Sequence, residues 1–208
     1  MPSRTSSSSP APLLADRRLY LVTPLRADFE DYLEAAIRGG VDVVQVRDRS
    51  VSDGRLLEAL AQARSVAAAH RVPLGVNDRP DLAVLAEADF VHVGQEDIPV
   101  EAVRTFALPV GLSTHAPQEI EAARSDYIAV GPVHATPTKE GRPAVGLELV
   151  RYAAANAKLP WFAIGGIDAS NVADVVGAGA TRIAVVRAIV EADDPERAAR
   201  ELHAALPG

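Results

Sequence analysis

Two acidic residues stand at the ends of neighbouring strand-like segments: Asp78 in "NDRP" and Asp97 in "GQED". Neighbouring parallel strands are roughly 5 Å apart, so both carboxylates can reach one hard cation. Two carboxylates, completed by water and a ligand phosphate, are how proteins usually hold Mg²⁺ beside a polyphosphate. The pair therefore predicts Mg²⁺ as a cofactor. Taken singly, Asp78 could instead cap the helix that begins near Pro80, and "GQED" could be a solvated acidic turn.

Other polar residues and glycines follow the remaining apolar runs. They are Gln45, Arg47, Arg49, Asn77, Gln95, Ser113, the loop from Thr136 to Lys139, Gly165, Gly166 and Arg187. In a parallel barrel the carboxyl ends of all strands meet at the face that carries the active site, so these segments are predicted to converge on one mouth. The double glycine of "AIGGIDASN" predicts a phosphate site there, because loops after the last two barrel strands often present backbone amides to phosphate. Tight-turn geometry alone could also explain the glycines, and Ser113 could instead cap the helix after Pro117.

Lys139 is one of two lysines in a chain that has 19 arginines. It lies in the proline-broken loop "TPTKEGRP", between a strand-like run and a helical segment. We infer that the function of this loop requires the ammonium group of a lysine rather than a guanidinium. An ammonium is a compact charge with three rotatable donors, whereas a guanidinium imposes a planar fork.

Eight short runs rich in Val, Ile and Leu must position these residues. They span residues 18–24, 41–47, 72–78, 89–94, 109–114, 126–131, 161–166 and 182–187, and most are followed by an Ala-rich helical stretch. Near-continuous apolar strands are typical of a parallel sheet buried on both faces, so the α/β pattern predicts a single (β/α)8 TIM barrel. An open Rossmann-type sheet is the alternative, but its glycine fingerprint is absent after the first run. His92 alternates with apolar neighbours and is interpreted as a satisfied inward-facing or strand-end histidine rather than a base.

Composition sets the remaining limits. A chain of 208 residues predicts one domain, with residues 1–16 as a disordered Ser/Pro-rich tail and residues 17–208 as the catalytic barrel. The net charge of -7 argues against a nucleic-acid surface. No apolar run approaches the roughly 18 residues of a membrane span, and the first residues lack the apolar core of a signal peptide. With no cysteine, disulfides and thiolate chemistry are excluded, and the cytoplasm is the expected compartment.

Several motifs together resemble one enzyme family. They are "QVRDR" (45–49), "VNDRPDLA" (76–83), "ADFVHVGQEDIP" (88–99), "GLSTH" (111–115), "DYIAVGPVHATPTK" (126–139), "FAIGGIDASNV" (162–172) and "AVVRAI" (184–189). In this order they are similar to thiamine phosphate synthase, and the resemblance runs from about residue 18 to 204. The family implies a (β/α)8 barrel and a transferase. It joins 4-amino-5-hydroxymethyl-2-methylpyrimidine diphosphate to a thiazole phosphate, which could be carboxylated, and releases pyrophosphate.

The resemblance also implies roles for single residues. The pyrimidine diphosphate would contact Gln45, Arg47, Arg49, Asn77, Ser113 and Lys139, of which Arg47, Arg49, Ser113 and Lys139 would take part in catalysis. Mg²⁺ would be bound by Asp78 and Asp97. The thiazole phosphate would face Thr136, Thr138, Gly166, Val186 and Arg187. Two positions depart from the family pattern, because Arg49 stands where lysine is common and Arg187 stands where serine is common.

The chemistry explains why cations are needed and a protein nucleophile is not. Breaking the bond from the pyrimidine methylene carbon to oxygen leaves positive charge on carbon and negative charge on pyrophosphate, so a dissociative substitution is expected. Small molecules are the expected partners, and the oligomeric state, a homo-oligomer included, stays open. A non-catalytic or tautomerase-like thiazole-phosphate-binding barrel is the alternative, although it would not need the acidic pair. A phosphosugar isomerase would need a base and a neutral partner that the mouth does not offer.

Overall fold

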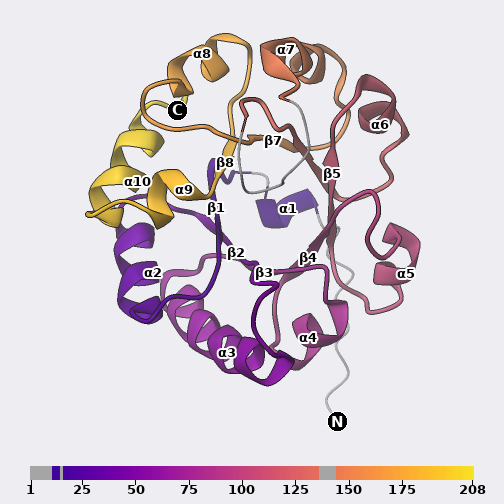
Figure 1. Ribbon diagram of the computed structural model, residues 1–208. Helices are drawn as coiled ribbons and strands as arrows, with labels where there is room; N and C mark the ends of the chain where they lie inside the picture. The colour runs from indigo at the N-terminus through magenta and orange to yellow at the C-terminus, as the bar shows by residue number, and fades with distance from the viewer. Residues whose placement is uncertain (1–10, 15, 136–143) are drawn as a thin grey trace.

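The apolar runs of the sequence form the strands of a closed parallel barrel (Figure 1). The computed structural model describes residues 11–14, 16–135 and 144–208. Each strand pairs with the next one, and β1 pairs with β8, so the predicted (β/α)8 barrel is confirmed and the open sheet is wrong. The strands are β1 (Leu19–Thr23), β2 (Val43–Val46), β3 (Leu74–Asn77), β4 (Phe90–Val93), β5 (Val110–Thr114), β6 (Tyr127–Val130), β7 (Trp161–Ile164) and β8 (Ile183–Val185).

A ring of helices surrounds the barrel (Figure 1). Their apolar faces pack against the outward side chains of the strands, which is why the strands read as continuous apolar runs. No described helix is both long enough and apolar enough to cross a membrane. The helices are α1 (Ala11–Leu14), α2 (Phe29–Arg38), α3 (Asp53–His70), α4 (Pro80–Leu85), α5 (Val100–Arg104), α6 (Pro117–Ala122), α7 (Gly146–Asn156), α8 (Val172–Gly177), α9 (Arg187–Val190) and α10 (Pro195–Ala204).

Four aromatic rings fill the lower interior of the barrel. Tyr20, Phe90, Tyr127 and Phe162 are all buried, and the centroids of their contacting rings lie 5.3 to 6.2 Å apart. Most of these contacts are edge-to-face, the arrangement that the quadrupole of an aromatic ring favours. The barrel therefore has a packed floor, and its polar chemistry is confined to the mouth above it.

Two strand glycines make room for this floor. A Cβ atom at Gly75 would lie 2.1 Å from a ring carbon of Phe90, and one at Gly111 would lie 2.1 Å from a ring carbon of Tyr127. Each glycine faces its ring from the neighbouring strand, since Gly75 pairs with Phe90 and Gly111 with Tyr127. The missing side chains of β3 and β5 thus provide the volume that two large rings occupy.

The segment before β1 differs from the prediction. Residues 1–16 were expected to form a disordered tail, whereas Ala11–Leu14 forms the short helix α1 and Leu14 is buried against the floor of the barrel. Figure 1 shows α1 across the centre of the barrel when it is viewed along its axis. Residues 1–10 and 15 lie outside the described residues, so for them the tail stays a prediction.

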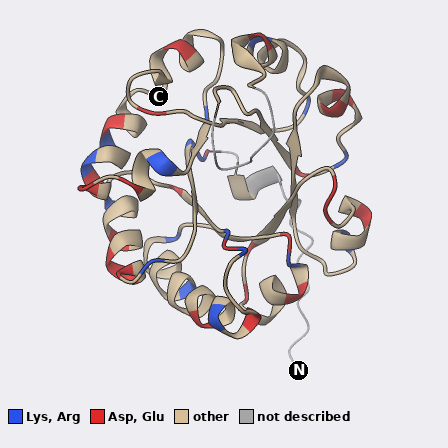
Figure 2. Cartoon of the chain, in the orientation of Figure 1, with Lys and Arg blue, Asp and Glu red and all other residues tan. Residues whose placement is uncertain are grey.

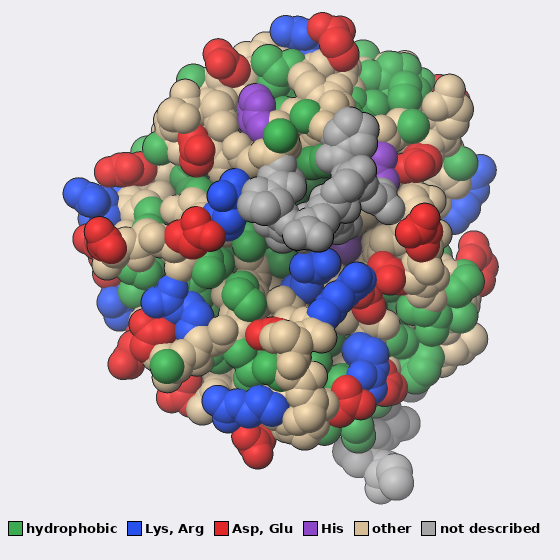
Figure 3. Space-filling view, in the orientation of Figure 1, with side chains coloured by type: hydrophobic (Ala, Val, Ile, Leu, Met, Phe, Trp, Pro, Cys, Tyr) green, Lys and Arg blue, Asp and Glu red, His purple; other side chains and the backbone are tan. Residues whose placement is uncertain are grey.

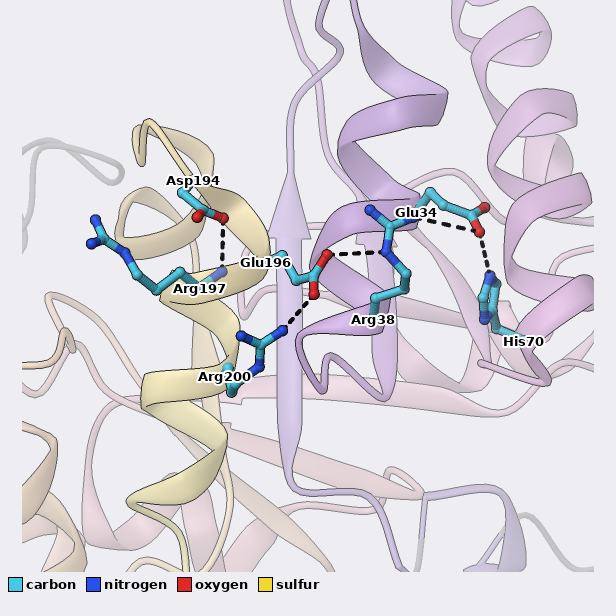
Figure 4. Close-up of polar contacts among 7 residues, drawn as sticks. All are labelled: Glu34, Arg38, His70, Asp194, Glu196, Arg197 and Arg200. Carbon is cyan, nitrogen blue, oxygen red and sulfur yellow. Dashed lines mark hydrogen bonds and ion pairs between the residues drawn. The ribbon is translucent and has the colours of Figure 1, made fainter.

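The first and last long helices of the barrel meet in a close contact. Gly39, at the end of α2, lies against α10, where an added Cβ atom would be 2.3 Å from the backbone oxygen of Glu196. Around this contact Glu196 pairs with Arg38 at 3.0 Å and with Arg200, and Arg38 also pairs with Glu34 (Figure 4). Exposed ion pairs contribute roughly 0.2–1 kcal/mol each, so we assign the fit of the two helices mainly to the glycine.

Candidate active site

The two predicted metal carboxylates lie together at the mouth, and an arginine bridges them. The Arg49 guanidinium pairs with Asp78 Oδ2 and lies 3.3 Å from Asp97 Oδ1. Asp78 has φ of 62°, a left-handed conformation that aspartate tolerates better than most residues. It does not cap α4, whose N-cap is Arg79 with no side-chain hydrogen bond. The capping alternative is therefore wrong, and the Asp78 carboxylate faces the mouth.

The electrostatics of this cluster are set by burial and by close charges. Burial raises the pKa of the Asp78 carboxyl, the Arg49 guanidinium opposes that rise, and the Asp97 charge adds to it. The hydrogen bond to Asp78 raises the pKa of Arg49. Acidic and basic residues are spread over the outer helices, and a further group of both signs lies inside that ring at the ends of β2 to β4 (Figure 2). A half-buried acidic pair is expensive without a cation, and Arg49 supplies one here.

The residues present fit a divalent cation that keeps other ligands. Asp78 Oδ1 is buried and has no hydrogen-bond partner among the described residues, so this oxygen could take a proton or a metal. Asp97 Oδ2 accepts a hydrogen bond from the Gly94 amide at 2.9 Å, which fixes the carboxylate. The described residues contain no cluster of three His, Cys, Asp or Glu side chains that could hold a metal. Two carboxylates with water and ligand phosphate suit Mg²⁺, and the Mg²⁺ site stays a prediction.

Arg47 supplies a second cation beside the acidic pair. Its side chain is half-buried, and burial lowers the pKa of its guanidinium. No described residue forms a hydrogen bond or an ion pair with that guanidinium, although Asp78 and Asp97 act on it at longer range. In the space-filling view, blue side chains lie near the middle of the face, toward β2 to β4 (Figure 3). A half-buried guanidinium of this kind is suited to bind an anion such as a diphosphate.

A layer of hydrogen-bonded polar side chains lies just below the charged rim. Gln45 is 2% exposed and donates from Nε2 to Asn77 Oδ1 at 3.2 Å. Across the barrel, the Ser113 hydroxyl lies 2.9 Å from His92 Nε2, and Gln95 donates to the Ser113 backbone oxygen at 2.7 Å. Ser113 does not cap α6, so that alternative is wrong. His92 is buried with partners on both ring nitrogens, as predicted.

A cavity of about 240 Å³ opens beside the β7 and β8 ends. It reaches Ser113, so it is continuous with the polar layer. The glycine turn that lines it is strained for other residues: Gly165 has φ of 105° and Gly166 has φ of 64°. A Cβ atom at Gly165 would lie 2.5 Å from Pro132 Cα. Turn geometry therefore suffices to explain the two glycines. The other lining residues are His115, Gly131, Pro132, Ile164, Ile167, Asp168, Ala184, Val185, Val186, Arg187, Ala188 and Glu191.

Arg187 begins α9 and is exposed at the edge of this cavity. A side chain at this position could instead form a surface ion pair with Glu191, one helical turn on. The Glu191 amide donates to the Arg187 backbone oxygen at 3.0 Å, but no ion pair joins their side chains. Val186 lines the same cavity. The structure therefore brings Gly166, Val186 and Arg187 together, and their contact with a phosphate stays a prediction.

Three predicted site residues are not described by the structure, and two tyrosines beneath the site were not predicted. Thr136, Thr138 and Lys139 lie outside the described residues. Sequence reasoning missed Tyr20 and Tyr127, whose hydroxyls are 3.0 Å apart beneath the polar layer. A signal was available, because a tyrosine inside a buried strand needs a hydrogen-bond partner for its hydroxyl.

The closed barrel and its polar mouth define a (β/α)8-barrel enzyme. Residues 19–189 match the family model described as thiamine monophosphate synthase, and the chain belongs to this family. The thiamine-phosphate synthase of Arthrobacter sp. (strain FB24) is 48% identical, over 93% of this chain and 96% of that protein. A thiamine-phosphate synthase of Thermus thermophilus is 50% identical, over 92% of this chain and 98% of that protein.

Solved structures share the barrel fold of this chain. The thiamine phosphate pyrophosphorylase from Pyrococcus furiosus has a TM-score of 0.81 and 30% identity, and the match covers 90% of this chain and 94% of that one. A 3-hexulose-6-phosphate synthase has a TM-score of 0.64 at 24% identity, over 91% of this chain and 100% of that one, which shows the shared barrel fold alone.

Proposed function

We propose that this chain is a thiamine-phosphate synthase. It joins 4-amino-5-hydroxymethyl-2-methylpyrimidine diphosphate to a thiazole phosphate, carboxylated or not, and releases pyrophosphate. The family and the high identity to relatives of that name support the proposal. The observation that carries it is the acidic pair bridged by Arg49, because a barrel that only binds a phosphate has no need of two half-buried carboxylates at its mouth.

The two halves of the mouth suit the two substrates. Arg47, Arg49 and the acidic pair stand at the ends of β2 to β4, where a diphosphate with its metal would lie. The cavity at β7 and β8, with Gly166 and Arg187 in its lining, is where a single phosphate group would lie. Ser113 lines this cavity and contacts His92 on β4. Lys139 enters the proposal from the sequence alone.

The reaction requires separation of charge more than acid–base chemistry. The bond between the pyrimidine methylene carbon and the diphosphate oxygen breaks, and its electron pair leaves with pyrophosphate. The lone pair of the thiazole nitrogen then forms the new carbon–nitrogen bond. Arg47 and Arg49 stabilise the leaving charge by direct electrostatic contact, and the barrel walls hold the thiazole close to the carbon. No protein nucleophile is used.

Asp78 and Asp97 would hold Mg²⁺ in this reaction. The ion supplies positive charge to the oxygens of the leaving pyrophosphate. Asp78 Oδ1 is buried and no described residue forms a hydrogen bond with it, which supports this assignment, as does the restraint of Asp97 by the Gly94 amide.

The alternative is a non-catalytic or tautomerase-like barrel that binds the thiazole phosphate only. The cavity lined by Gly166 and Arg187 is compatible with it, but the acidic pair would then have no use. Incubation with both substrates and Mg²⁺, followed by measurement of pyrophosphate, separates the two functions. Binding of thiazole phosphate with no pyrophosphate released would favour the alternative.

Substitutions of the acidic pair test the metal assignment. Asp78→Asn and Asp97→Asn should each lower kcat by about a hundredfold or more, because several kcal/mol of transition-state stabilisation depends on the ion. Raising the Mg²⁺ concentration should recover part of the loss. The matched control is Asp81→Asn, which also removes one aspartate charge, from an exposed ion pair with Arg79. Wild-type turnover of both acidic-pair variants at limiting Mg²⁺ would refute the shared metal site.

A further inference from the structure

Buried and half-buried polar side chains form a continuous chain of hydrogen bonds beneath the mouth. It starts at the Asp78 carboxylate, crosses the barrel above its aromatic floor and ends at Ser113 on the opposite wall. Three links join one side: Asn77 to Asp78, Gln45 to Asn77 at 3.2 Å, and Tyr20 to Gln45 at 3.1 Å. The other links complete the path: Tyr20 to Tyr127 at 3.0 Å, Tyr127 to His92 at 2.9 Å, and His92 to Ser113 at 2.9 Å.

The carboxylate fixes the direction of the first links. Asp78 Oδ2 accepts a hydrogen bond from the Arg49 guanidinium, which can only donate, so the Asn77 group that faces the same oxygen is the Nδ2 amine. The Asn77 oxygen then faces Gln45 and can only accept, so Gln45 must turn its Nε2 amine toward Asn77. The Gln45 oxygen in turn faces Tyr20, which must donate its single hydroxyl proton to it. Both amide orientations thus follow from the contact between Arg49 and Asp78.

The same logic continues to the other wall. Since the Tyr20 proton is used on Gln45, Tyr20 must accept from the Tyr127 hydroxyl. Tyr127 has then used its own proton and must accept from His92 Nδ1, which therefore carries a hydrogen. In a neutral imidazole the other nitrogen is an acceptor, so Nε2 accepts from the Ser113 hydroxyl. Every proton in the chain points from Ser113 toward Asp78.

The surroundings support neutral groups along the path. Tyr20, Tyr127, Gln45, His92 and Ser113 are all buried. Burial raises the pKa of both tyrosines above the ordinary value, so each keeps the one proton that the direction requires. A buried polar group left without a partner costs about 1–3 kcal/mol, which makes reversal of one link costly unless its neighbours reverse too.

We propose that His92 is a positioning residue whose Nδ1–H form is fixed by this one-way chain, so that its Nε2 atom holds the Ser113 hydroxyl in one orientation. The Ser113 proton points inward to His92, and the lone pairs of Ser113 Oγ face the mouth as hydrogen-bond acceptors. The effect on turnover rests on the proposed function, which places Ser113 beside the pyrimidine diphosphate. The protonation state of His92 in the free protein does not depend on it.

Nuclear magnetic resonance of the free protein tests the proposal directly. Long-range ¹⁵N–¹H correlation spectra of histidine-labelled protein at about pH 8, where an ordinary imidazole is neutral, report which ring nitrogen carries the proton. The His92 signals are those that disappear in His92→Gln. We expect neutral His92 with the proton on Nδ1. A proton on Nε2 instead, or on both nitrogens, would overturn the one-way chain whatever the activity of the protein.

Removal of one hydroxyl from the chain tests its role in catalysis. Tyr127→Phe removes the acceptor for the His92 Nδ1–H group. The same spectra should then no longer show His92 with its proton on Nδ1 alone. We expect kcat/KM for the pyrimidine diphosphate to fall about tenfold, with little change in KM for the thiazole phosphate. Tyr32→Phe is the matched control, because it also removes a buried tyrosine hydroxyl, on α2 and outside the chain. An unchanged His92 spectrum and unchanged kcat/KM in Tyr127→Phe would refute the positioning role.

Discussion

Arg49 occupies both carboxylates that are predicted to bind the metal, and this makes its replacement informative. In the structure its guanidinium pairs with Asp78 and Asp97 at once. A divalent cation that binds between the same oxygens must displace the guanidinium from at least part of this contact. We therefore expect Arg49→Met to bind Mg²⁺ more tightly than the wild-type protein when substrates are absent, while turnover falls.

The size of the effect follows from the exposure of the ion pairs. The Arg49 side chain is 59% exposed, so each of its two contacts is worth only about 0.5–1 kcal/mol in water. Without these two contacts, Mg²⁺ binding no longer has to displace about 1–2 kcal/mol of ion pairing. This corresponds to an increase in Mg²⁺ affinity of roughly 5- to 30-fold. Turnover should fall by at least about tenfold, because the leaving pyrophosphate loses a nearby cation.

Isothermal titration of the free protein with Mg²⁺ measures the first effect, and steady-state pyrophosphate release measures the second. Arg55→Met is the matched control, since it removes an exposed arginine that pairs with Glu58 on α3, away from the acidic pair. It should leave both quantities unchanged. Unchanged or weaker Mg²⁺ binding by Arg49→Met would show that the guanidinium and the ion do not compete for the two carboxylates.

Two further predictions follow from the packing and from the cavity. Gly111→Ala should lower the free energy of unfolding by about 1–3 kcal/mol or more, because its methyl group would overlap the Tyr127 ring. Gly54→Ala has no atom within 4 Å of the new methyl group and should raise the free energy of unfolding by up to about 1 kcal/mol. Chemical denaturation compares the two variants, and equal effects would contradict the packing argument. Arg187→Ser should raise KM for the thiazole phosphate several-fold and make it less sensitive to salt. A KM for the thiazole phosphate that is unchanged at every salt concentration would show that Arg187 does not contact this substrate.

The barrel and its mouth could be predicted because their signals are local in the sequence. A strand buried on both faces needs a run of apolar residues, and each run carries its own polar residues at its carboxyl end. The run at 72–78 therefore gave both β3 and the site residues Asn77 and Asp78. Once a barrel is inferred, all such ends converge on one face without further knowledge.

The contacts beneath the mouth could not be predicted because they depend on the register between distant strands. The hydrogen-bonded path from Tyr20 to Tyr127 and His92 crosses the barrel interior, and no spacing in the sequence predicts it. The bridge from Arg49 to both aspartates depends in the same way on where three loops meet. The burial of Leu14 was missed because a Ser/Pro-rich composition outweighed one short apolar pair.

Closure of the barrel between β1 and β8 has a consequence for synthesis of the chain. Leu19 pairs with Ile183, so one edge of β1 has no partner until the chain has been made as far as β8. At about 5–20 residues per second the ribosome needs roughly ten to thirty seconds to supply it. Open strand edges of apolar sequence readily pair with other chains. The β1 edge of the growing polypeptide is therefore open to aggregation until β8 emerges, and a chaperone that covers this edge during that interval should raise the yield of folded protein.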